Sequence, residues 1–141
     1  MFYEQRMAVP ETPDTLRAEY DDDLRAIVEQ TGLENAASET DIDAERLETV
    51  LDGDSPDLTL EEAAEIQSLG EGDPDPETIV EIACDHLLLG MTTAVLDVDS
   101  LASVLEIDRD AKEIQQKIER RAPMSFSEFV YIQHAIVSGK R

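Results

Sequence analysis

Two segments of this chain carry the same helix signals in the same order. Residues 56–67, PDLTLEEAAEIQ, and residues 123–133, PMSFSEFVYIQ, each place a proline before a Ser/Thr-x-x-Glu capping box and a run that reaches Ile-Gln. In such a box the hydroxyl accepts from the backbone amide three residues on, and the glutamate reaches back to the cap residue. Residues 36–43 and 101–108, which both end in Ile-Asp, precede the two segments. We therefore predict two related helical units.

Apolar residues recur at helical spacing along almost the whole chain, between cap and stop signals. The longest helix is expected over about 76–96, is apolar over much of its circumference, and so belongs at the centre or against a partner. No alternating stretch is long enough for a sheet, and residues 2–9 are expected as a short arm. We predict an all-α helical bundle of two units around this long central apolar helix.

The length of 141 residues suits a single domain, which we expect to span 1–141. Its sub-units are expected to be an N-terminal unit over 12–70, a hinge and central helix over 71–98, and a C-terminal unit over 99–138. The N-terminus lacks the apolar core of a signal peptide, and the longest apolar run is about half of what a membrane span needs. We expect a cytoplasmic protein without a membrane contact.

Each unit resembles the lambda-repressor/Cro-like helix-turn-helix. The first unit fills the slots of that pattern with Ala37, Ile42, Asp43, Leu47, Gly53, Pro56 and Thr59. The second unit departs from it, since seven residues instead of five separate Ile107 from Ile114, and Arg120 stands in the glycine slot. The full-length layout also looks like a family of small, acidic, uncharacterised haloarchaeal proteins, a resemblance that implies no known activity.

The charge balance is strongly acidic, with 34 Asp and Glu against 11 Lys and Arg and a net charge of -23. The acids are interspersed with apolar residues at helical spacing, so they are expected on the solvent faces and not in a disordered tail. At about 1 M salt the Debye length is about 3 Å, which screens the self-repulsion of such a surface. This composition is typical of a halophile's protein.

The bases concentrate at the C-terminal end. Residues 109–141 hold 7 bases and 4 acids, whereas residues 1–108 hold 4 bases and 30 acids. In a helix-turn-helix the second helix enters the major groove, where Lys and Arg neutralise phosphate and Gln pairs with adenine. The candidate contact residues for nucleic acid or a partner are therefore Lys112, Gln115, Gln116, Lys117, Arg120 and Arg121.

Other roles for these bases stay open. Glu113 can pair with Lys117 one turn later, the two arginines can interact with the helix dipole, and the cluster can dock on the acidic first unit. In the first unit the corresponding helix, AERLETVLDGD, is acidic, with an outer face that would repel phosphate. That face consists of Glu45, Arg46, Glu48, Thr49 and Asp52.

Catalytic and metal chemistry find little support. The chain has one cysteine, Cys84, and two histidines, of which His86 lies on another helix face and His134 lies far away in sequence. We expect no enzyme, no metal and no cofactor. The hypothesis is a non-enzymatic binding or regulatory protein, with DNA binding through the second unit as its sharpest form. The alternative is a protein–protein module, including a homodimer through helix 76–96.

Overall fold

The computed structural model describes residues 1–54, 57–105 and 109–139, and within these ranges it contains eight helices and no strand. The all-α prediction is confirmed. The helices are α1 (Pro13–Thr31), α2 (Leu33–Glu39), α3 (Ala44–Leu51), α4 (Leu60–Gln67), α5 (Pro76–Ala94), α6 (Val98–Val104), α7 (Ala111–Ile118) and α8 (Phe126–Ser138). Pro56 and Ile107, which the helix-turn-helix comparison used, lie outside the described residues.

Local cap chemistry explains where these helices begin. The Thr12 hydroxyl accepts from the Thr15 amide at 3.1 Å at the start of α1. Both predicted capping boxes form completely: at α4 between Thr59 and Glu62, and at α8 between Ser125 and Glu128. Each box satisfies two backbone amides that would otherwise lack a partner at a helix start. The repeated signal in the sequence is therefore a repeated structure.

The repeat extends further than the sequence comparison indicated, because it includes the long helices. α1 and α5 both have 19 residues and both carry proline at their first position, Pro13 and Pro76. Each long helix is followed by two short helices and then by the helix that starts at a capping box. The chain is thus α1–α4 followed by α5–α8, and α5 is the first helix of the second unit and not a separate element between two units.

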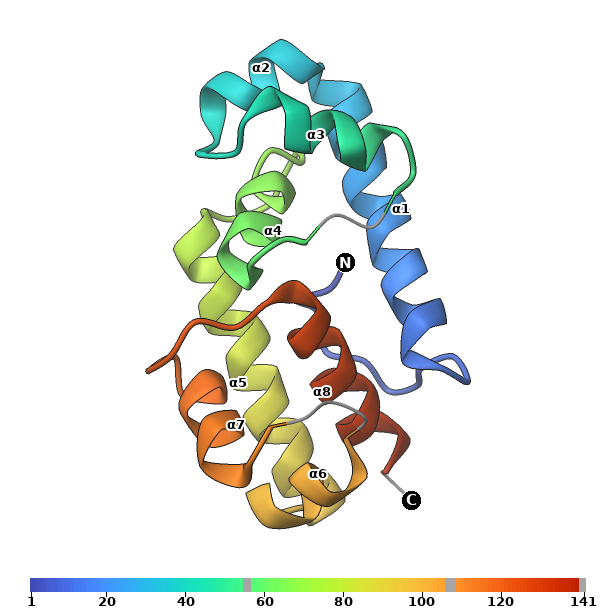
Figure 1. Ribbon diagram of the computed structural model, residues 1–141, viewed down its shortest axis with the longest axis vertical. Helices are drawn as coiled ribbons and strands as arrows, with labels where there is room; N and C mark the ends of the chain where they lie inside the picture. The colour runs from blue at the N-terminus through green and yellow to red at the C-terminus, as the bar shows by residue number, and fades with distance from the viewer. Residues whose placement is uncertain (55–56, 106–108, 140–141) are drawn as a thin grey trace.

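The two units face each other across an approximate two-fold axis. The backbone amide of Leu60 donates to the carbonyl of Met124 at 2.9 Å, and the amide of Phe126 donates to the carbonyl of Leu58 at 2.8 Å. These residues correspond in the two units, so each hydrogen bond becomes the other when the units are exchanged. Figure 1 shows the result, with α4 and α8 in the middle and the pairs α2–α3 and α6–α7 at opposite ends.

The turns after α3 and α7 also correspond. Gly53 has φ 84° and Arg120 has φ 66°, so both residues are in the left-handed region that commonly ends a helix. Glycine reaches this conformation without cost, whereas a residue with a Cβ is strained there by about 1–2 kcal/mol. The second unit therefore keeps the left-handed backbone conformation at this position, although the residue there is arginine.

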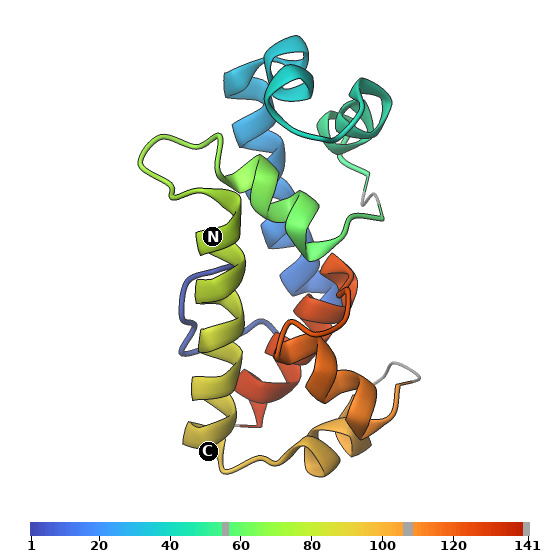
Figure 2. The ribbon, with the colours of Figure 1, turned by 90° about the vertical axis from the view of Figure 1, so that its left-hand side faces the viewer.

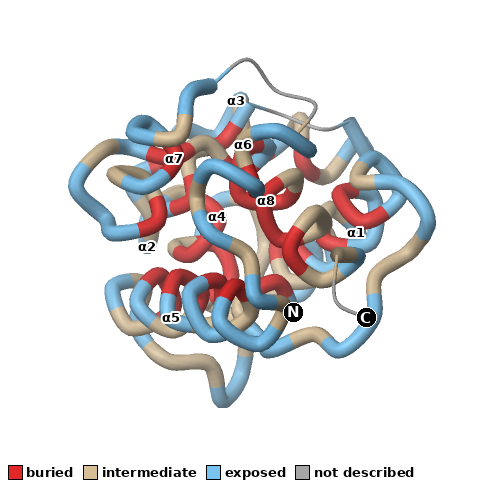
Figure 3. The backbone as a smooth tube through the Cα atoms, turned by 90° about the horizontal axis from the view of Figure 1, so that it is seen from below, coloured by how far each residue is buried: buried red, intermediate tan, exposed pale blue. Residues whose placement is uncertain are grey.

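The core lies along the inner faces of α1, α4, α5 and α8, as the buried stretches in Figure 3 show. Corresponding positions are buried in both units, such as Leu16 and Ile79, and Gln67 and Gln133. The buried side chains differ in size, because the core between α1 and α8 contains aromatic rings where the core between α4 and α5 contains alanine. Tyr20 donates to Gln133 Oε1, whereas the residue that corresponds to Tyr20 in the second unit is Ala83. Gln67, which corresponds to Gln133, therefore has an Oε1 without a hydrogen-bond partner within the described residues.

An N-terminal strap, residues 1–12, closes the aromatic side and runs beside α5 in Figure 2. Phe2 is 1% exposed and packs edge-on against Phe126 and Phe129. Gln133 Nε2 donates to the Phe2 carbonyl at 3.3 Å, and His86 Nδ1 lies 2.8 Å from the Tyr3 carbonyl. The strap is therefore anchored in the core by Phe2, although several of its other residues, such as Met7, are exposed.

The outer face of α5 is exposed, including Leu88 and Leu89 at 44% and 47%. The expectation that this helix is apolar nearly all round thus holds for its composition, but only one side of it packs inside the chain. No single helix of the described residues is both long enough and apolar enough to cross a membrane.

Candidate functional site

The predicted contact residues all lie on α7 or just after it. Ile114 and Ile118 face the core, as the helical spacing predicted, and are 0% and 2% exposed. Of the six candidates, Gln116 and Lys117 are half-buried, and the exposed ones are Lys112, Gln115, Arg120 and Arg121. The structure therefore keeps these residues on one short segment, but their side chains have different surroundings.

Lys117 is held inside the second unit. Its Nζ donates to both carboxylate oxygens of Glu128 at 2.8 Å and to the carbonyl of Pro123 at 3.1 Å. Burial opposes the ionisation of Glu128, but hydrogen bonds from Lys117, the Ser125 amide and Arg109 outweigh it and lower the pKa of this carboxyl. Glu113, the partner considered from the sequence, lies instead 3.8 Å from Arg109. Lys117 thus stabilises the capping box of α8.

The first unit contains the same arrangement with a different cation. Arg46 donates through Nη1 and Nη2 to the carboxylate of Glu62, the Nη2 distance being 2.8 Å, and its Nη2 also donates to the Asp57 carbonyl. The hydrogen bond from Arg46 lowers the pKa of Glu62, and the same contact raises the pKa of Arg46. Each unit therefore uses one cation of its third helix, α3 or α7, to hold the capping-box glutamate and the preceding loop.

Two further candidates are engaged by an acid of their own segment. Gln115 Nε2 donates to Glu119 at 3.0 Å, and Arg121 Nη2 donates to the same carboxylate. These contacts, first the one from Gln115, lower the pKa of Glu119. The side chains of Lys112 and Arg120 make no hydrogen bond or ion pair with any residue that the structure describes. The basic segment is therefore less positive at its surface than its sequence suggests.

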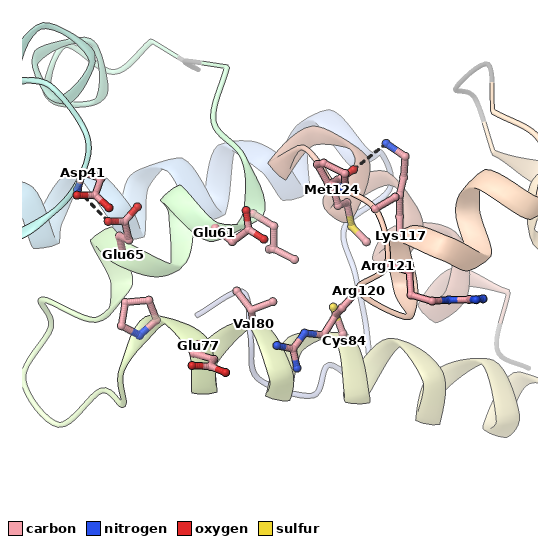
Figure 4. Close-up of a pocket in the computed structure, with 14 residues that line it drawn as sticks. Asp41, Glu61, Glu65, Glu77, Val80, Cys84, Lys117, Arg120, Arg121 and Met124 are labelled. Atoms are coloured by element: carbon pink, nitrogen blue, oxygen red, sulfur yellow. Dashed lines mark hydrogen bonds between the residues drawn. The ribbon is translucent and has the colours of Figure 1, made fainter.

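A cleft of about 640 Å³ lies between α4, α5 and the loop 119–125. Its floor is mostly apolar, formed by Leu60, Val80, Cys84 and Met124. Four acids line one part of it and three bases line the other, as Figure 4 shows. The acids are Asp41, Glu61, Glu65 and Glu77, and the bases are Lys117, Arg120 and Arg121.

The two rims of this cleft differ in how far their charges are neutralised. Glu65 accepts from the Asp41 amide at 2.8 Å, whereas the carboxylates of Glu61 and Glu77 have no ion pair within the described ranges. On the other rim Arg120 reaches toward Cys84 and Val80 in Figure 4. Its charge has an effect there, since burial raises the pKa of the Cys84 thiol to about 11 and Arg120 opposes that rise.

Cys84 and the two histidines have structural surroundings. A thiol with so high a pKa is a poor nucleophile at neutral pH. His86 is bound to the strap, and His134 Nε2 lies 2.8 Å from the Pro10 carbonyl. In the described ranges no three side chains of the metal-binding types come together. The cleft is therefore the stronger candidate for a functional site than Cys84 or the histidines.

Sequence reasoning located the basic rim of the cleft but missed its acidic rim and its floor. Glu61, Glu65, Glu77 and Val80 looked like ordinary positions of acidic amphipathic helices. The repeat in the sequence was the available signal. When the two long helices are aligned at their first prolines, Val80 corresponds to Arg17 and Cys84 corresponds to Asp21. A change from a charged pair to an apolar pair at corresponding positions of the two long helices marks a place where the two units differ in packing.

A family model described as a family of unknown function (DUF5791) matches residues 16–139. The match covers most of the chain, so the chain belongs to this family. The matched residues extend from α1 to α8 and so include helices of both four-helix units. No curated protein and no solved structure matches the chain.

Proposed function

We propose that this member of the DUF5791 family is a non-enzymatic regulatory or adaptor protein that binds a segment of another protein in the cleft between α4, α5 and loop 119–125. The observation that carries the proposal is the cleft itself, with an apolar floor and charged groups on opposite rims. A concave, largely apolar surface with a few placed polar groups is the usual form of a binding pocket. Its volume of about 640 Å³ accommodates several side chains of an extended segment.

The contacts of the basic segment favour a protein partner over DNA. Lys117 is engaged by Glu128, and Arg121 is engaged by Glu119, so two of the cations are neutralised within the chain. Affinity for DNA depends on cations that are free to replace the counterions of phosphate groups. A protein segment needs fewer free charges and gains from the apolar floor.

The same proposal includes adaptation to molar salt. The net charge of -23 comes from acids that mostly lie on exposed positions, such as Glu19, Asp22 and Glu48. Salt at molar concentration screens the repulsion between them. Binding in the cleft then depends on apolar contact and short charge-assisted hydrogen bonds, since long-range attraction is screened as well.

Site-specific photocrosslinking tests the proposal under native salt. A benzoylphenylalanine in place of Ala122 lies on the rim of the cleft, and the same residue in place of Glu48 lies on the outer face of α3. In extract at about 2.5 M KCl, where salt screening is strong, we expect a discrete crosslinked protein from position 122 and none from position 48. Equal labelling from both positions, or none from position 122, would contradict the proposal.

DNA binding through the second unit is a second candidate function. It is supported by the exposure of Lys112 and Gln115 on α7, the second helix of the helix-turn-helix-like pair, and of Arg121 just after it. The test is binding of genomic DNA fragments in about 2.5 M KCl, chosen to keep the acidic surface screened, by the wild type and by Lys112→Glu/Arg121→Glu. The double variant avoids Lys117, whose replacement would disturb the capping box of α8. Binding by the wild type that the variant loses would favour the regulator.

A homodimer through α5 is the remaining form of the protein–protein hypothesis. Leu88 and Leu89 are the exposed apolar residues of its outer face. Light scattering in molar KCl tests this homodimer. A dimer that Leu88→Glu converts to a monomer would support an interface on the outer face of α5.

A further inference from the structure

The approximate two-fold relation gives the cleft a counterpart in the other half of the molecule. Pro13 corresponds to Pro76 in the long helices, and Thr59 corresponds to Ser125 at the capping boxes. These offsets pair the cleft residues of α5 with residues of α1, and the cleft residues of α4 with residues of α8. The pairs that matter are Val80 with Arg17, Cys84 with Asp21, Leu60 with Phe126, and Glu61 with Ser127.

An arginine side chain occupies the counterpart. Arg17 is 9% exposed, and its Nε donates to Asp21 Oδ1 at 2.8 Å. Its Nη1 donates to Ser127 Oγ at 2.7 Å, and its guanidinium lies over the Phe126 ring at 4.9 Å from the centroid. The guanidinium thus has a carboxylate at one edge, a hydroxyl at another and an apolar ring beneath it, which is a favourable seat for a desolvated arginine.

Val80 stands in the cleft where Arg17 stands in the counterpart, and its short side chain does not fill the space, toward which Arg120 reaches from loop 119–125. The hollow on the α1–α8 side, about 570 Å³, includes Pro13, Asp14 and Tyr131 but not Arg17. The cleft on the α4–α5 side includes the corresponding Pro76, Glu77 and Glu65, and it continues past Val80 to Cys84. The additional space is therefore the place that an arginine fills in the first half.

The groups around this open place suit a guanidinium. Leu60 offers an apolar surface where the counterpart has Phe126, and Glu61 offers a carboxylate where the counterpart has a hydroxyl. Glu65 and Glu77 add negative charge on the same rim. Planar guanidinium groups pair with carboxylates through two parallel hydrogen bonds and are more weakly hydrated than ammonium groups.

We propose that the cleft binds an arginine side chain of the partner segment, seated beside Val80 and paired with Glu61, as Arg17 is seated beside Asp21 in the first half. The proposal rests on the proposed function and specifies the chemistry of the partner. Arg120, on the opposite rim, is a competitor for the same acids and a source of like-charge repulsion. Its removal should therefore strengthen binding of an arginine, whereas it would weaken binding of an acidic segment.

The test uses blocked tripeptides and isotope-labelled full-length protein in about 2.5 M KCl, a salt concentration chosen for screening. Acetyl-Ala-Arg-Ala-amide is compared with its citrulline counterpart, which has nearly the same shape without the charge, and with acetyl-Ala-Glu-Ala-amide. Amide chemical shifts report the binding. We expect the arginine peptide to shift the resonances of Leu60, Val80 and Cys84, and to bind at least about tenfold more tightly than the citrulline peptide, the ratio for about 1.4 kcal/mol.

Matched variants identify the groups involved. Glu61→Gln should weaken the arginine peptide about tenfold, while Glu48→Gln, the same change on the outer face of α3, should leave it unchanged. Arg120→Ala should tighten it about two- to fivefold. Equal affinity for arginine and citrulline, preference for the glutamate peptide, or no shift with any peptide would overturn the arginine proposal. A cleft-specific photocrosslink would still support the proposed function in any of these cases, so the two failures are distinguishable.

Discussion

Replacing Lys117 by methionine separates a structural role from a contact role for the basic segment. The side chain keeps its length but loses the ammonium group, which makes two 2.8 Å contacts to Glu128 and one 3.1 Å contact to the Pro123 carbonyl. Glu128 is 8% exposed and keeps its contacts to Arg109 and the Ser125 amide. A hydrogen bond to a charged group contributes about 1.5–3 kcal/mol, and these three share one cation, so we expect a loss of about 2–3 kcal/mol in the free energy of unfolding.

Urea unfolding followed by circular dichroism in molar KCl measures this loss. At about 4 °C per kcal/mol for a chain of this size, the midpoint of thermal unfolding should fall by about 8–12 °C. Lys112→Met is the control, because Lys112 is exposed on the same helix and should change stability by less than about 0.5 kcal/mol. Adding Glu128→Gln to both backgrounds gives the coupling energy, expected at about 1.5–3 kcal/mol for Lys117.

Equal effects of the Lys117 and Lys112 substitutions would refute this reasoning. Lys117 would then be a surface cation available to a ligand, and the basic segment would regain the role in nucleic-acid contact that its sequence suggested. A large effect of Lys117→Met without coupling to Glu128 would also contradict it, because the loss would then come from packing of the aliphatic chain.

Three further outcomes follow from the same structure. Gly53→Ala should cost about 1 kcal/mol because of its φ of 84°, whereas Arg120→Gly should be neutral or stabilise by up to about 1 kcal/mol, both measured by urea unfolding. Lowering KCl from about 3 M to about 0.05 M should unfold the chain through unscreened repulsion, and an unchanged dichroism spectrum would refute salt adaptation. Because the folded-state pKa of Glu128 lies below 4.5, the stability it contributes is present above that pH and is lost below it. The stability gap between wild type and Glu128→Gln should therefore narrow as the pH falls below 4.5, and a constant gap would contradict this.

Local signals in the sequence were enough to predict the helices and the core positions that follow them. Capping boxes act within four residues, so Thr59 and Ser125 could be assigned without knowledge of the fold. Helical spacing likewise placed Ile114 and Ile118 inside. These predictions depend on backbone chemistry that is the same in any helical protein.

Pairings between distant segments could not be predicted in the same way. α1 and α5 correspond in length, proline position and burial, but Arg17 and Val80, or Tyr20 and Ala83, share no chemical type. The strap is too short for periodicity to show that Phe2 is buried, since its burial depends on rings from α1 and α8. The cleft depends on the absence of an arginine side chain at Val80, and that absence becomes visible only when the two long helices are compared with each other.

The partner of Lys117 illustrates the same limit. Glu113 and Lys117 have the spacing of a helical ion pair, and the sequence offered no reason to prefer an acid on another helix. In the structure Glu128 is already oriented by its capping box and is shielded from water, which makes it the stronger partner. Local spacing predicts which pairs are possible, and tertiary packing decides which of them form.

The Val80→Arg variant tests the central claim, that an open arginine seat in the second half corresponds to a filled one in the first. Val80 occupies the position of Arg17, and Glu61 and Leu60 surround it. The measurement is the titration of folded Val80→Arg protein with acetyl-Ala-Arg-Ala-amide in about 2.5 M KCl, where screening is strong. We predict that the new arginine fills the cleft and abolishes the shifts at Leu60 and Cys84. Binding of the peptide with wild-type affinity would contradict the account.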